Sequence, residues 1–458
     1  MAAAKIKVDK QPTITGKYEV PVGWVKELNN FDMTGARNKT QGTSNKFYHI
    51  ELQLAPDGKC QLYTEYGPTG RVQAREWRYF GIDRTSAETE FNSIIKSKTK
   101  KGYVEIDVAQ RAIGSSEAQK QTKDVVLKNA PKITKKGSSL HPETARVVST
   151  LMGSTNLFVV KTLKCPLGQL SNTQIDKGRD KLNQAKIIVA QDKLNEADKD
   201  QLVQLTNDFY GLIPHNLGSG VRGQMTHLLL DTQSKIDQKE YDLDTLLDAK
   251  AIGANLTSTS IYDQYESLET EFLFIDHSDS MFRWLNDLIQ ATRATNHNHL
   301  GRVVLCNAWD VQRKNERDSF LKRANVVAAE CGNQIIPEQM NDLVNARKDI
   351  DNLSLYRKAN IIPLFHGTRT QNISGILKQG MLIRPSGVVI TGAMYGNAIY
   401  WGKSTKAINY TNIRASYWAK GNDDRAFLFI GDCALGSQLV AHHASQFTAK
   451  NIAPNHSV

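Results

Sequence analysis

The hydrophobic pattern of this 458-residue chain changes its period twice, and this succession most limits what the chain can fold into. Tyr48, Ile50, Leu52 and Leu54 alternate with polar residues, which is the two-residue period of a half-buried strand. Residues 143–250 instead carry apolar stripes at helical spacing, and short β-rich runs separated by glycine-rich loops follow them. A chain of this length is too long for one core, so we expect several domains of different class.

The expected domain boundaries follow these changes of pattern. The sequence predicts a multidomain α+β fold, in which a small antiparallel sheet with one helix precedes an all-α helical bundle and then a mixed α+β domain. We expect a flexible N-terminal extension, the sheet domain, a basic linker, the helical domain and the mixed domain at residues 1–40, 41–110, 111–140, 141–258 and 259–458, respectively.

Charge favours an acidic partner without proving one. The net charge is +11, from 58 Lys and Arg against 47 Asp and Glu. Much of the excess lies between Lys96 and Lys136, where a solvated linker explains it about as well as a DNA-contacting arm. Apolar runs are too short for a membrane span and the N-terminus has no export segment, so we expect an intracellular protein without membrane contact. The five cysteines lack zinc-site spacing, and no metal is expected.

The apolar run Ile361–Leu364 leads almost directly into His366 and Gly367, and a helix is expected to begin at Thr370. Gly367 has no Cβ, so a ligand can approach its backbone closely. A backbone N–H and C=O at this position suit a planar carboxamide, which needs one donor and one acceptor. Nicotinamide carries such a group.

A second stretch places Tyr395, Tyr400, Trp401 and Tyr410 among glycines. These rings offer flat faces for stacking on a sharply turning backbone. Aromatic residues at such spacing are more often core residues, so the stretch alone is weak evidence for a site.

Together these motifs resemble those of the poly(ADP-ribose) polymerase family. HGTRTQNISGILKQG is similar to the family's His-Gly-Ser/Thr-Arg motif with its following helix, TGAMYGNAIY to a second motif, and Asn409-Tyr410 to a later pair. CPLGQLSNTQI and LTNDFYGLIPHN are similar to the family's helical regulatory domain, and the antiparallel module occupies the place of the WGR domain. The resemblance implies an ADP-ribosyltransferase fold for the last domain, lacking its final strands.

The resemblance also implies the roles of particular residues. His366 and Tyr400 would be catalytic, and NAD would bind to His366, Gly367, Thr368, Tyr400 and Tyr410. His366 would hold the adenosine-side ribose, the Gly367 backbone would pair with the carboxamide, and Tyr410 would stack on the nicotinamide ring. NAD is then a substrate, whose ADP-ribose passes to protein acceptors while nicotinamide is released, and no metal is needed.

Activation by DNA breaks and, in a eukaryotic source, a nuclear location are implied by the same resemblance. The motif that names the WGR domain appears here as Tyr66-Gly67-Pro68, without its Trp and Arg. Arg71, Arg75 and Trp77 lie near enough in the sequence to replace them, and these three are the candidate DNA-binding residues.

Two further departures from the family leave an alternative open. Ala407 stands where the family has a serine that helps to hold the carboxamide. The family's glutamate near the C-terminus has no counterpart, because the last glutamate is Glu338, and we expect the chain to be a fragment. The alternative is a relative that binds NAD or DNA without catalysis, or that transfers a single ADP-ribose.

Overall fold

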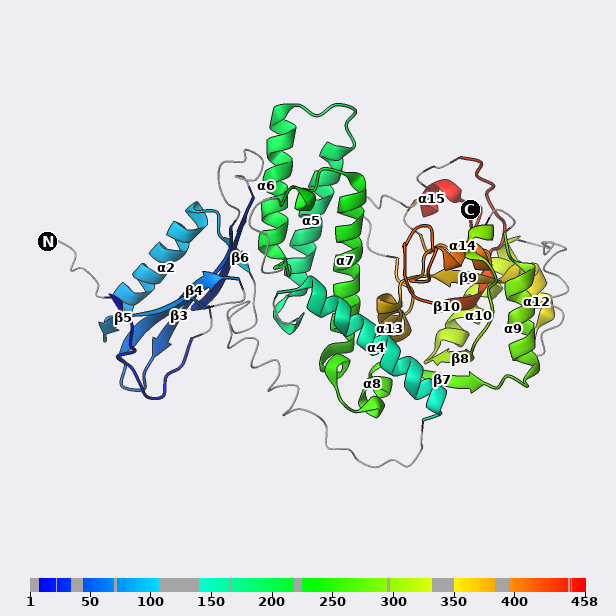
Figure 1. The fold of residues 1–458 in the computed structure, drawn as a ribbon, viewed down its shortest axis with the longest axis horizontal. Coiled ribbons are helices and arrows are strands. Elements are labelled where there is room, and N and C mark those ends of the chain that lie inside the picture. Colours follow the sequence, from blue (N-terminus) through cyan, green and yellow to red (C-terminus); the bar gives the residue numbers. More distant parts are fainter. Residues whose placement is uncertain are drawn as a thin grey trace. The chain divides into compact units, whose positions relative to one another are not determined.

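The computed structural model describes residues 8–21, 23–33, 44–69, 72–106, 140–164, 167–217, 225–294, 297–331, 350–383, 395–396, 398–443, 445 and 447–458. The chain divides into two compact units (Figure 1), Met1–Ala130 with Leu157–Lys250 and Pro131–Asn156 with Ala251–Val458. The multidomain α+β class is confirmed, since a sheet with one helix is followed by helices and then by mixed helices and strands. The predicted linker lies almost entirely outside the described residues.

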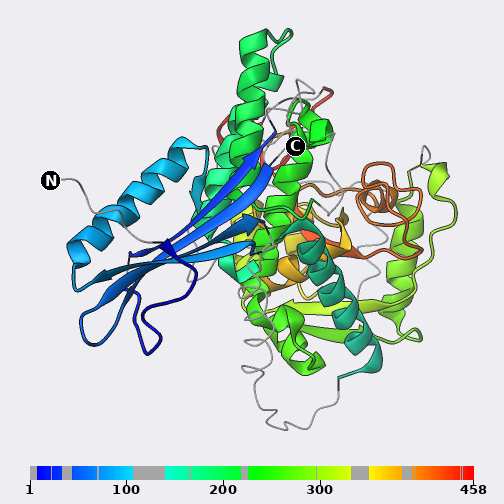
Figure 2. The ribbon, with the colours of Figure 1, turned by 60° about the vertical axis from the view of Figure 1, so that its left-hand side comes forward.

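The first unit begins with a six-stranded antiparallel sheet, whose strands lie in the order β1-β5-β4-β3-β2-β6. Helix α2, Arg84–Lys100, lies across one face of this sheet, as Figures 1 and 2 show from two sides. The strands are β1 (Val8–Asp9), β2 (Val25–Asp32), β3 (Ser44–Leu54), β4 (Cys60–Pro68), β5 (Ala74–Gly81) and β6 (Val104–Ile106).

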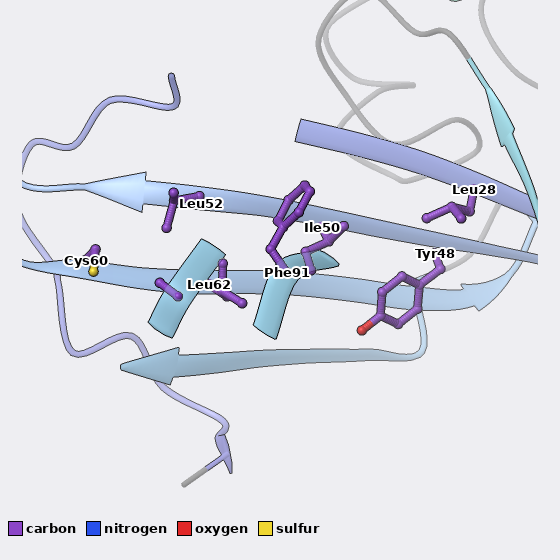
Figure 3. Close-up of a cluster of buried hydrophobic side chains, with 8 residues drawn as sticks. Leu28, Tyr48, Ile50, Leu52, Cys60, Leu62 and Phe91 are labelled. Atoms are coloured by element: carbon purple, nitrogen blue, oxygen red, sulfur yellow. The ribbon is translucent and has the colours of Figure 1, made fainter. Parts of the chain in front are cut away.

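The two-residue alternation of β3 places Tyr48, Ile50 and Leu52 on the face that α2 covers (Figure 3). These side chains are buried in one cluster, whose other members are Leu28, Cys60, Leu62, Ala87 and Phe91. Full burial of an aliphatic or aromatic side chain stabilises a fold by roughly 1.5–3 kcal/mol. The strand expected from alternation is therefore the strand that anchors this core.

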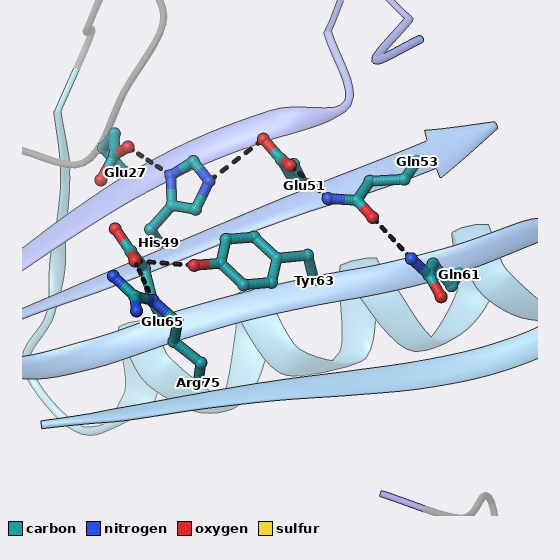
Figure 4. Close-up of polar contacts among 8 residues, drawn as sticks. All are labelled: Glu27, His49, Glu51, Gln53, Gln61, Tyr63, Glu65 and Arg75. Atoms are coloured by element: carbon teal, nitrogen blue, oxygen red, sulfur yellow. Dashed lines mark hydrogen bonds and ion pairs between the residues drawn. The ribbon is translucent and has the colours of Figure 1, made fainter. Parts of the chain in front are cut away.

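The opposite face of the sheet is polar and also buried (Figure 4). His49 lies between two carboxylates: its Nδ1 contacts Glu27, and its Nε2 lies 3.3 Å from Glu51 Oε2. Burial alone would lower the pKa of His49, but the charge of the Glu27 carboxylate and its hydrogen bond raise it to about 10. His49 is therefore an imidazolium at neutral pH.

Residues Val25–Asp32 form β2, where the sequence suggested a flexible extension. Leu28 is buried in the core, but Asn29 and Asn30 beside it are buried too, so the two-residue period is hidden. The amide of Asn29 makes its hydrogen bond with a residue distant in the sequence, because its Nδ2 donates to the Gly211 carbonyl oxygen at 3.0 Å. A buried amide is stable when its hydrogen bonds are made, and a local pattern does not reveal a distant partner.

Helices α5 (Asn172–Val189) and α6 (Glu196–Leu212) follow in the same unit, as does α7 (Gln233–Ile252) up to Lys250. The side chains of Ser171 and Asn195 cap α5 and α6. The stripe expected in α5 is buried at Ile175, Leu182, Ala185 and Ile188 and half-buried at Val189, and the stripe in α6 is buried at Leu202, Leu205 and Phe209. α6 packs against β2, where the Phe31 and Tyr210 ring centroids lie 4.9 Å apart.

Among its described residues, the second unit contains two antiparallel ladders, β7 with β8 and β9 with β10. The β-rich runs GRVVLCNAW, from Gly301, and SQLVAHH, from Ser437, were expected to form strands, but β8 starts only at Ala308 and residues 437–443 make a single bridge, between Gln438 and Ser457. The elements are α8 (Ile261–Ser267), β7 (Thr270–Ile275), α9 (Ser280–Ala291), β8 (Ala308–Arg313), α10 (Glu316–Cys331), α12 (Leu353–Lys358), β9 (Ile361–Gly367), α13 (Thr370–Gln379), α14 (Ser404–Ile408), β10 (Leu428–Ala434) and α15 (Ala449–Ile452).

The first part of helix α4, Pro142–Thr162, belongs to this second unit up to Asn156. Its buried Thr155 reaches the helix that follows β9: Thr155 Oγ1 lies 2.6 Å from Ser374 Oγ and 2.9 Å from the Gln371 carbonyl oxygen. The unit is thus built around β9, with polar contacts fixing α13 at its end.

Candidate active site

Strand β9 ends on the His-Gly pair that the sequence singled out. Residues Ile361–Phe365 are largely buried, and β10 pairs with β9 so that Phe429 lies opposite His366. On its other side, Phe365 exchanges two backbone hydrogen bonds with Gly402, each 2.9 Å long. This bridge holds the segment that carries Tyr400 beside His366.

The imidazole of His366 is held in one tautomer. Its Nδ1 lies 2.9 Å from the Tyr400 carbonyl oxygen, and because a carbonyl only accepts, Nδ1 carries the proton. Burial lowers the pKa of His366, and the bond to Tyr400 offsets only part of that effect. The ring is therefore neutral at pH 7, with an accepting lone pair on Nε2. The Trp401 and Phe429 rings flank it, with centroids at 5.7 and 6.5 Å.

Gly367 is the point of closest approach in the site. A Cβ at this position would lie 1.8 Å from the Ala407 carbonyl oxygen, so no residue with a side chain fits without moving backbone. The same oxygen accepts a hydrogen bond of 3.0 Å from the Tyr410 backbone N–H. The Ala407 carbonyl therefore packs against the backbone of Gly367 and also accepts a hydrogen bond from the segment that carries Tyr410.

Two tyrosines of this site are partly exposed, with 39% of the residue surface accessible for Tyr400 and 43% for Tyr410. The Tyr400 hydroxyl donates to the Gly396 carbonyl oxygen at 2.7 Å and accepts from the Tyr395 N–H at 3.0 Å. The Tyr410 ring stacks on Trp418, with centroids 6.2 Å apart and planes 19° apart. Burial raises the pKa of Tyr410, and the nearby Tyr400 adds to this effect. Both phenols are therefore neutral at pH 7.

Thr368 follows directly and turns toward the next helix, since its Oγ1 accepts from Asn372 Nδ2 at 3.0 Å. Asn412, which the sequence did not single out, caps that helix: its Oδ1 accepts from the Thr370 N–H at 2.7 Å. The structure therefore brings His366, Gly367, Tyr400 and Tyr410 together, with Thr368 at the start of α13.

Two of the residues expected to contact DNA, Arg75 and Trp77, lie in β5 of the sheet, and Figure 4 shows Arg75 on its polar face. Arg75 Nε lies 3.2 Å from Glu65 Oε2, and the Trp77 ring packs on Tyr63 with centroids 5.1 Å apart. Arg71 lies outside the described residues. Buried carboxylates on this face oppose the approach of a phosphate.

A group of cations lies at the end of α2, and its Lys98 and Lys101 belong to the basic stretch that the sequence left open between a solvated linker and a DNA-contacting arm. Lys98 Nζ stands 3.7 Å above the centroid of Tyr48. Burial and the neighbouring Lys101 lower the pKa of Lys98 to about 8, and the charges of Arg78 and Lys46 act in the same direction. A clustering of positive charge is the footprint expected of a phosphate contact. In the sequence, only the run of lysines near Lys98 indicated this group of cations.

Among the residues that the structure describes, no three His, Cys, Asp or Glu side chains are grouped so as to hold a metal ion. Within the same residues, no helix is both long enough and apolar enough to cross a membrane.

Comparison with known families agrees with this order of domains. Residues 32–110 match the WGR domain, residues 138–272 the poly(ADP-ribose) polymerase regulatory domain, and residues 280–458 the poly(ADP-ribose) polymerase catalytic domain. The chain is therefore a multidomain protein with the WGR, regulatory and catalytic domains of the poly(ADP-ribose) polymerase family.

Individual relatives carry the same family name. Poly [ADP-ribose] polymerase 2-A of Oryza sativa subsp. japonica is 25% identical over 83% of this chain and 54% of its own length. Poly [ADP-ribose] polymerase 1 of Xenopus laevis is 26% identical over 89% and 38%, and poly [ADP-ribose] polymerase 2 of Homo sapiens is 23% identical over 89% and 65%. The chain spans about half the length of the curated relatives it matches.

Proposed function

We propose that the chain is an NAD-dependent ADP-ribosyltransferase, which transfers ADP-ribose from NAD to protein acceptors and releases nicotinamide. The observation that carries this proposal is the approach of Gly367 to the Ala407 carbonyl, with Tyr410 one hydrogen bond away. The backbone of Gly367, which has no side chain, therefore lies near the partly exposed Tyr410. A nicotinamide needs both, because its carboxamide binds to a backbone and its flat ring stacks on an aromatic side chain. The match to the catalytic domain supports the same reaction.

In this proposal the nicotinamide ring stacks on Tyr410 and its carboxamide pairs with the Gly367 backbone. Tyr400, whose hydroxyl is anchored to the backbone of Gly396, lines the pocket from the other wall. Aromatic stacking contributes about 0.5–1.5 kcal/mol beyond area burial. Stacking therefore orients the ring, while the backbone of Gly367 selects the amide.

His366 holds the adenosine-side ribose in the same proposal. With Nδ1–H committed to the Tyr400 carbonyl, the neutral ring presents Nε2 as an acceptor for a ribose hydroxyl. Thr368, whose hydroxyl oxygen already accepts from Asn372, keeps its own O–H for donation to the dinucleotide. These contacts would fix the position of the adenosine-side ribose relative to the nicotinamide ring, which is the leaving group.

The reaction is glycosyl transfer. The bond between C1 of the ribose and the nicotinamide nitrogen breaks, its electron pair stays with nicotinamide, and positive charge develops on the sugar. A nucleophilic acceptor side chain then attacks C1 and loses its proton. The protein contributes mainly by holding NAD in a reactive geometry, which can supply several kcal/mol.

Binding of NAD without turnover is the second candidate. The observation that favours it is Ala407, because its buried methyl group offers no hydroxyl to the carboxamide and so orients the nicotinamide less firmly for reaction. Loss of one such hydrogen bond costs roughly 1 kcal/mol net, which weakens binding but does not abolish it.

We also propose DNA with breaks as the activating partner and, in a eukaryotic source, the nucleus as the location. The WGR match and the cations around Lys98 support this part of the proposal. Such contacts should weaken steeply with added salt.

The test mixes the whole chain with nicked DNA and NAD labelled separately in its nicotinamide and adenine parts. Release of labelled nicotinamide, with the adenine label bound to protein, supports the transferase. NAD binding without nicotinamide release supports the binding module instead. Absence of NAD binding contradicts both candidates. A parallel reaction without DNA shows whether DNA activates the transfer.

A further inference from the structure

Cys331, His456 and Glu330 form a chain of contacts outside the proposed NAD site. Cys331 Sγ lies 3.2 Å from His456 Nδ1, and His456 Nε2 lies 2.8 Å from Glu330 Oε2. The backbone N–H of Ser437 donates to the same sulphur at 3.3 Å, and Ser437 Oγ lies 3.0 Å from His456 Nδ1. A thiol, an imidazole and a carboxylate in series are the arrangement that activates a nucleophilic sulphur.

The backbone fixes the imidazole in this position. The His456 N–H donates to the Ser437 carbonyl oxygen and the Leu439 N–H to the Ser457 carbonyl oxygen, each at 2.8 Å. Gly436 has a φ of +57°, and a Cβ there would lie 2.7 Å from His456 Cγ. The ring thus occupies the space that a side chain at residue 436 would fill.

The chemistry of the contacts favours negative charge on the sulphur. Glu330 Oε2 accepts from Nε2, and a second proton on the ring would place an Nδ1–H toward Cys331 and Ser437. The Ser437 N–H adds a second donor to the sulphur. Cys331 is the last residue of α10, and a helix carboxyl end opposes negative charge, so the effect depends on His456.

We propose that Cys331 is a modification site, a thiolate paired with the His456 imidazolium that reacts with hydroperoxides. The sulphur attacks the distal peroxide oxygen, an S–O bond forms and the O–O bond breaks. The Nδ1 proton of His456 passes to the departing oxygen. Cys331 is oxidised to a sulfenic acid, and the peroxide is reduced to water or an alcohol.

This site is separate from the proposed NAD pocket. In the β9–β10 ladder, Leu428 pairs with Gly367 at one end and Ala434 with Ile361 at the other. Six residues of strand span about 20 Å. Cys331 lies beside the segment that follows Ala434, because Ser437 contacts it. Oxidation of Cys331 therefore does not depend on whether NAD binds at His366.

Other cysteines of the chain provide internal comparisons. Cys306 is exposed, and its Sγ faces the Val304 carbonyl oxygen at 3.9 Å rather than an imidazole. Burial raises the pKa of Cys433 to about 12, so its thiol stays protonated and unreactive in the folded protein. Cys306 reports ordinary thiol reactivity, and Cys433 reports whether the fold has opened.

The experiment treats the reduced full-length chain at pH 7 with limiting hydrogen peroxide, traps sulfenic acid with a cyclic 1,3-dione, and measures each cysteine by peptide mass spectrometry. We expect Cys331 to react at least about tenfold faster than Cys306. His456→Gln should lower the Cys331 rate by about tenfold and leave Cys306 unchanged.

Glu330→Gln is the second variant, at a side chain that is 53% exposed, so the substitution keeps the size of the side chain and does not touch the core. It should lower the Cys331 rate by at least about threefold, because the imidazolium loses its carboxylate. If Cys433 becomes reactive in His456→Gln, that variant is partly unfolded. The rate measured in Glu330→Gln then tests the proposal. The proposal is overturned if Cys331 reacts no faster than Cys306, or if its rate is unchanged in Glu330→Gln.

Discussion

At Gly367 one added carbon atom would collide with backbone, because the Ala407 carbonyl oxygen lies 1.8 Å from its position. Gly367→Ala should therefore shift the segment at Ala407 and Tyr410 and weaken NAD binding, and it should slow nicotinamide release by about 100-fold, since misplacement by about 1 Å can have that effect on a reaction rate. Calorimetric titration with NAD measures the loss.

Gly153→Ala is the matched control, because a Cβ at this α4 position meets nothing within 4 Å. It should leave NAD binding unchanged and stabilise the helix by up to about 1 kcal/mol. Equal binding by the Gly367→Ala and Gly153→Ala variants would show that the approach to Ala407 has no part in the site.

His49 gives the sheet domain a defined response to pH. Its pKa is raised to about 10 in the fold, above the ordinary 6.5, so its contribution to stability is complete below about pH 6.5 and is lost as pH rises toward 10. The pKa of Glu27 is also raised, by burial first, so it changes stability in the same direction at lower pH. The slope from one such proton is at most about 1.4 kcal/mol per pH unit.

We expect the nitrogen NMR signals of His49 to remain those of an imidazolium at pH 8. Denaturant unfolding between pH 7 and 10 should show a steeper loss of stability in the natural chain than in His49→Gln. Titration of His49 with a midpoint near 6.5 would contradict the buried ion pair.

At the scale of elements, the start of α13 is stabilised by a residue from a distant segment. Asn412→Ala removes the acceptor for the Thr370 N–H and should cost about 1 kcal/mol of unfolding free energy. Asn412→Asp keeps an acceptor at the positive end of the helix and should cost less. Thermal unfolding of both variants compares them, and equal losses would argue against capping.

Elements whose own side chains make the core were predictable from the sequence. Strand β3 could be predicted, because its alternate residues Tyr48, Ile50 and Leu52 are apolar and buried in the core. β2 could not, because Asn29 is satisfied by Gly211, which only the folded chain brings near. The cap from Asn412 was missed for the same reason, because Asn412 lies 42 positions from Thr370 in the chain.

At the scale of the whole molecule, the cations near Lys98 predict how DNA binding depends on salt. The double variant Lys46→Ala and Lys101→Ala should bind nicked DNA more weakly, with a slope of log affinity against log salt that is smaller by about 2. Lys59→Ala, an exposed lysine paired with Asp57, should leave the slope unchanged. Fluorescence anisotropy at several salt concentrations measures this, and an unchanged slope in the double variant would contradict the contact.

The candidate site was only partly readable from the sequence. His366, Gly367 and Thr368 are contiguous, so their chemistry could be considered locally, whereas Tyr400 and Tyr410 were joined to them through the family resemblance. The contact between Cys331 and His456 spans 125 positions and has no motif, so only the folded chain brings it out.

The most direct test of the proposed site is a crystal structure of the chain with nicotinamide bound. The ring should stack on Tyr410, with its carboxamide against the Gly367 backbone and Tyr400 on the other side. Nicotinamide bound at another surface, or His366, Gly367 and Tyr410 found too far apart to contact one ligand, would contradict the proposed transferase.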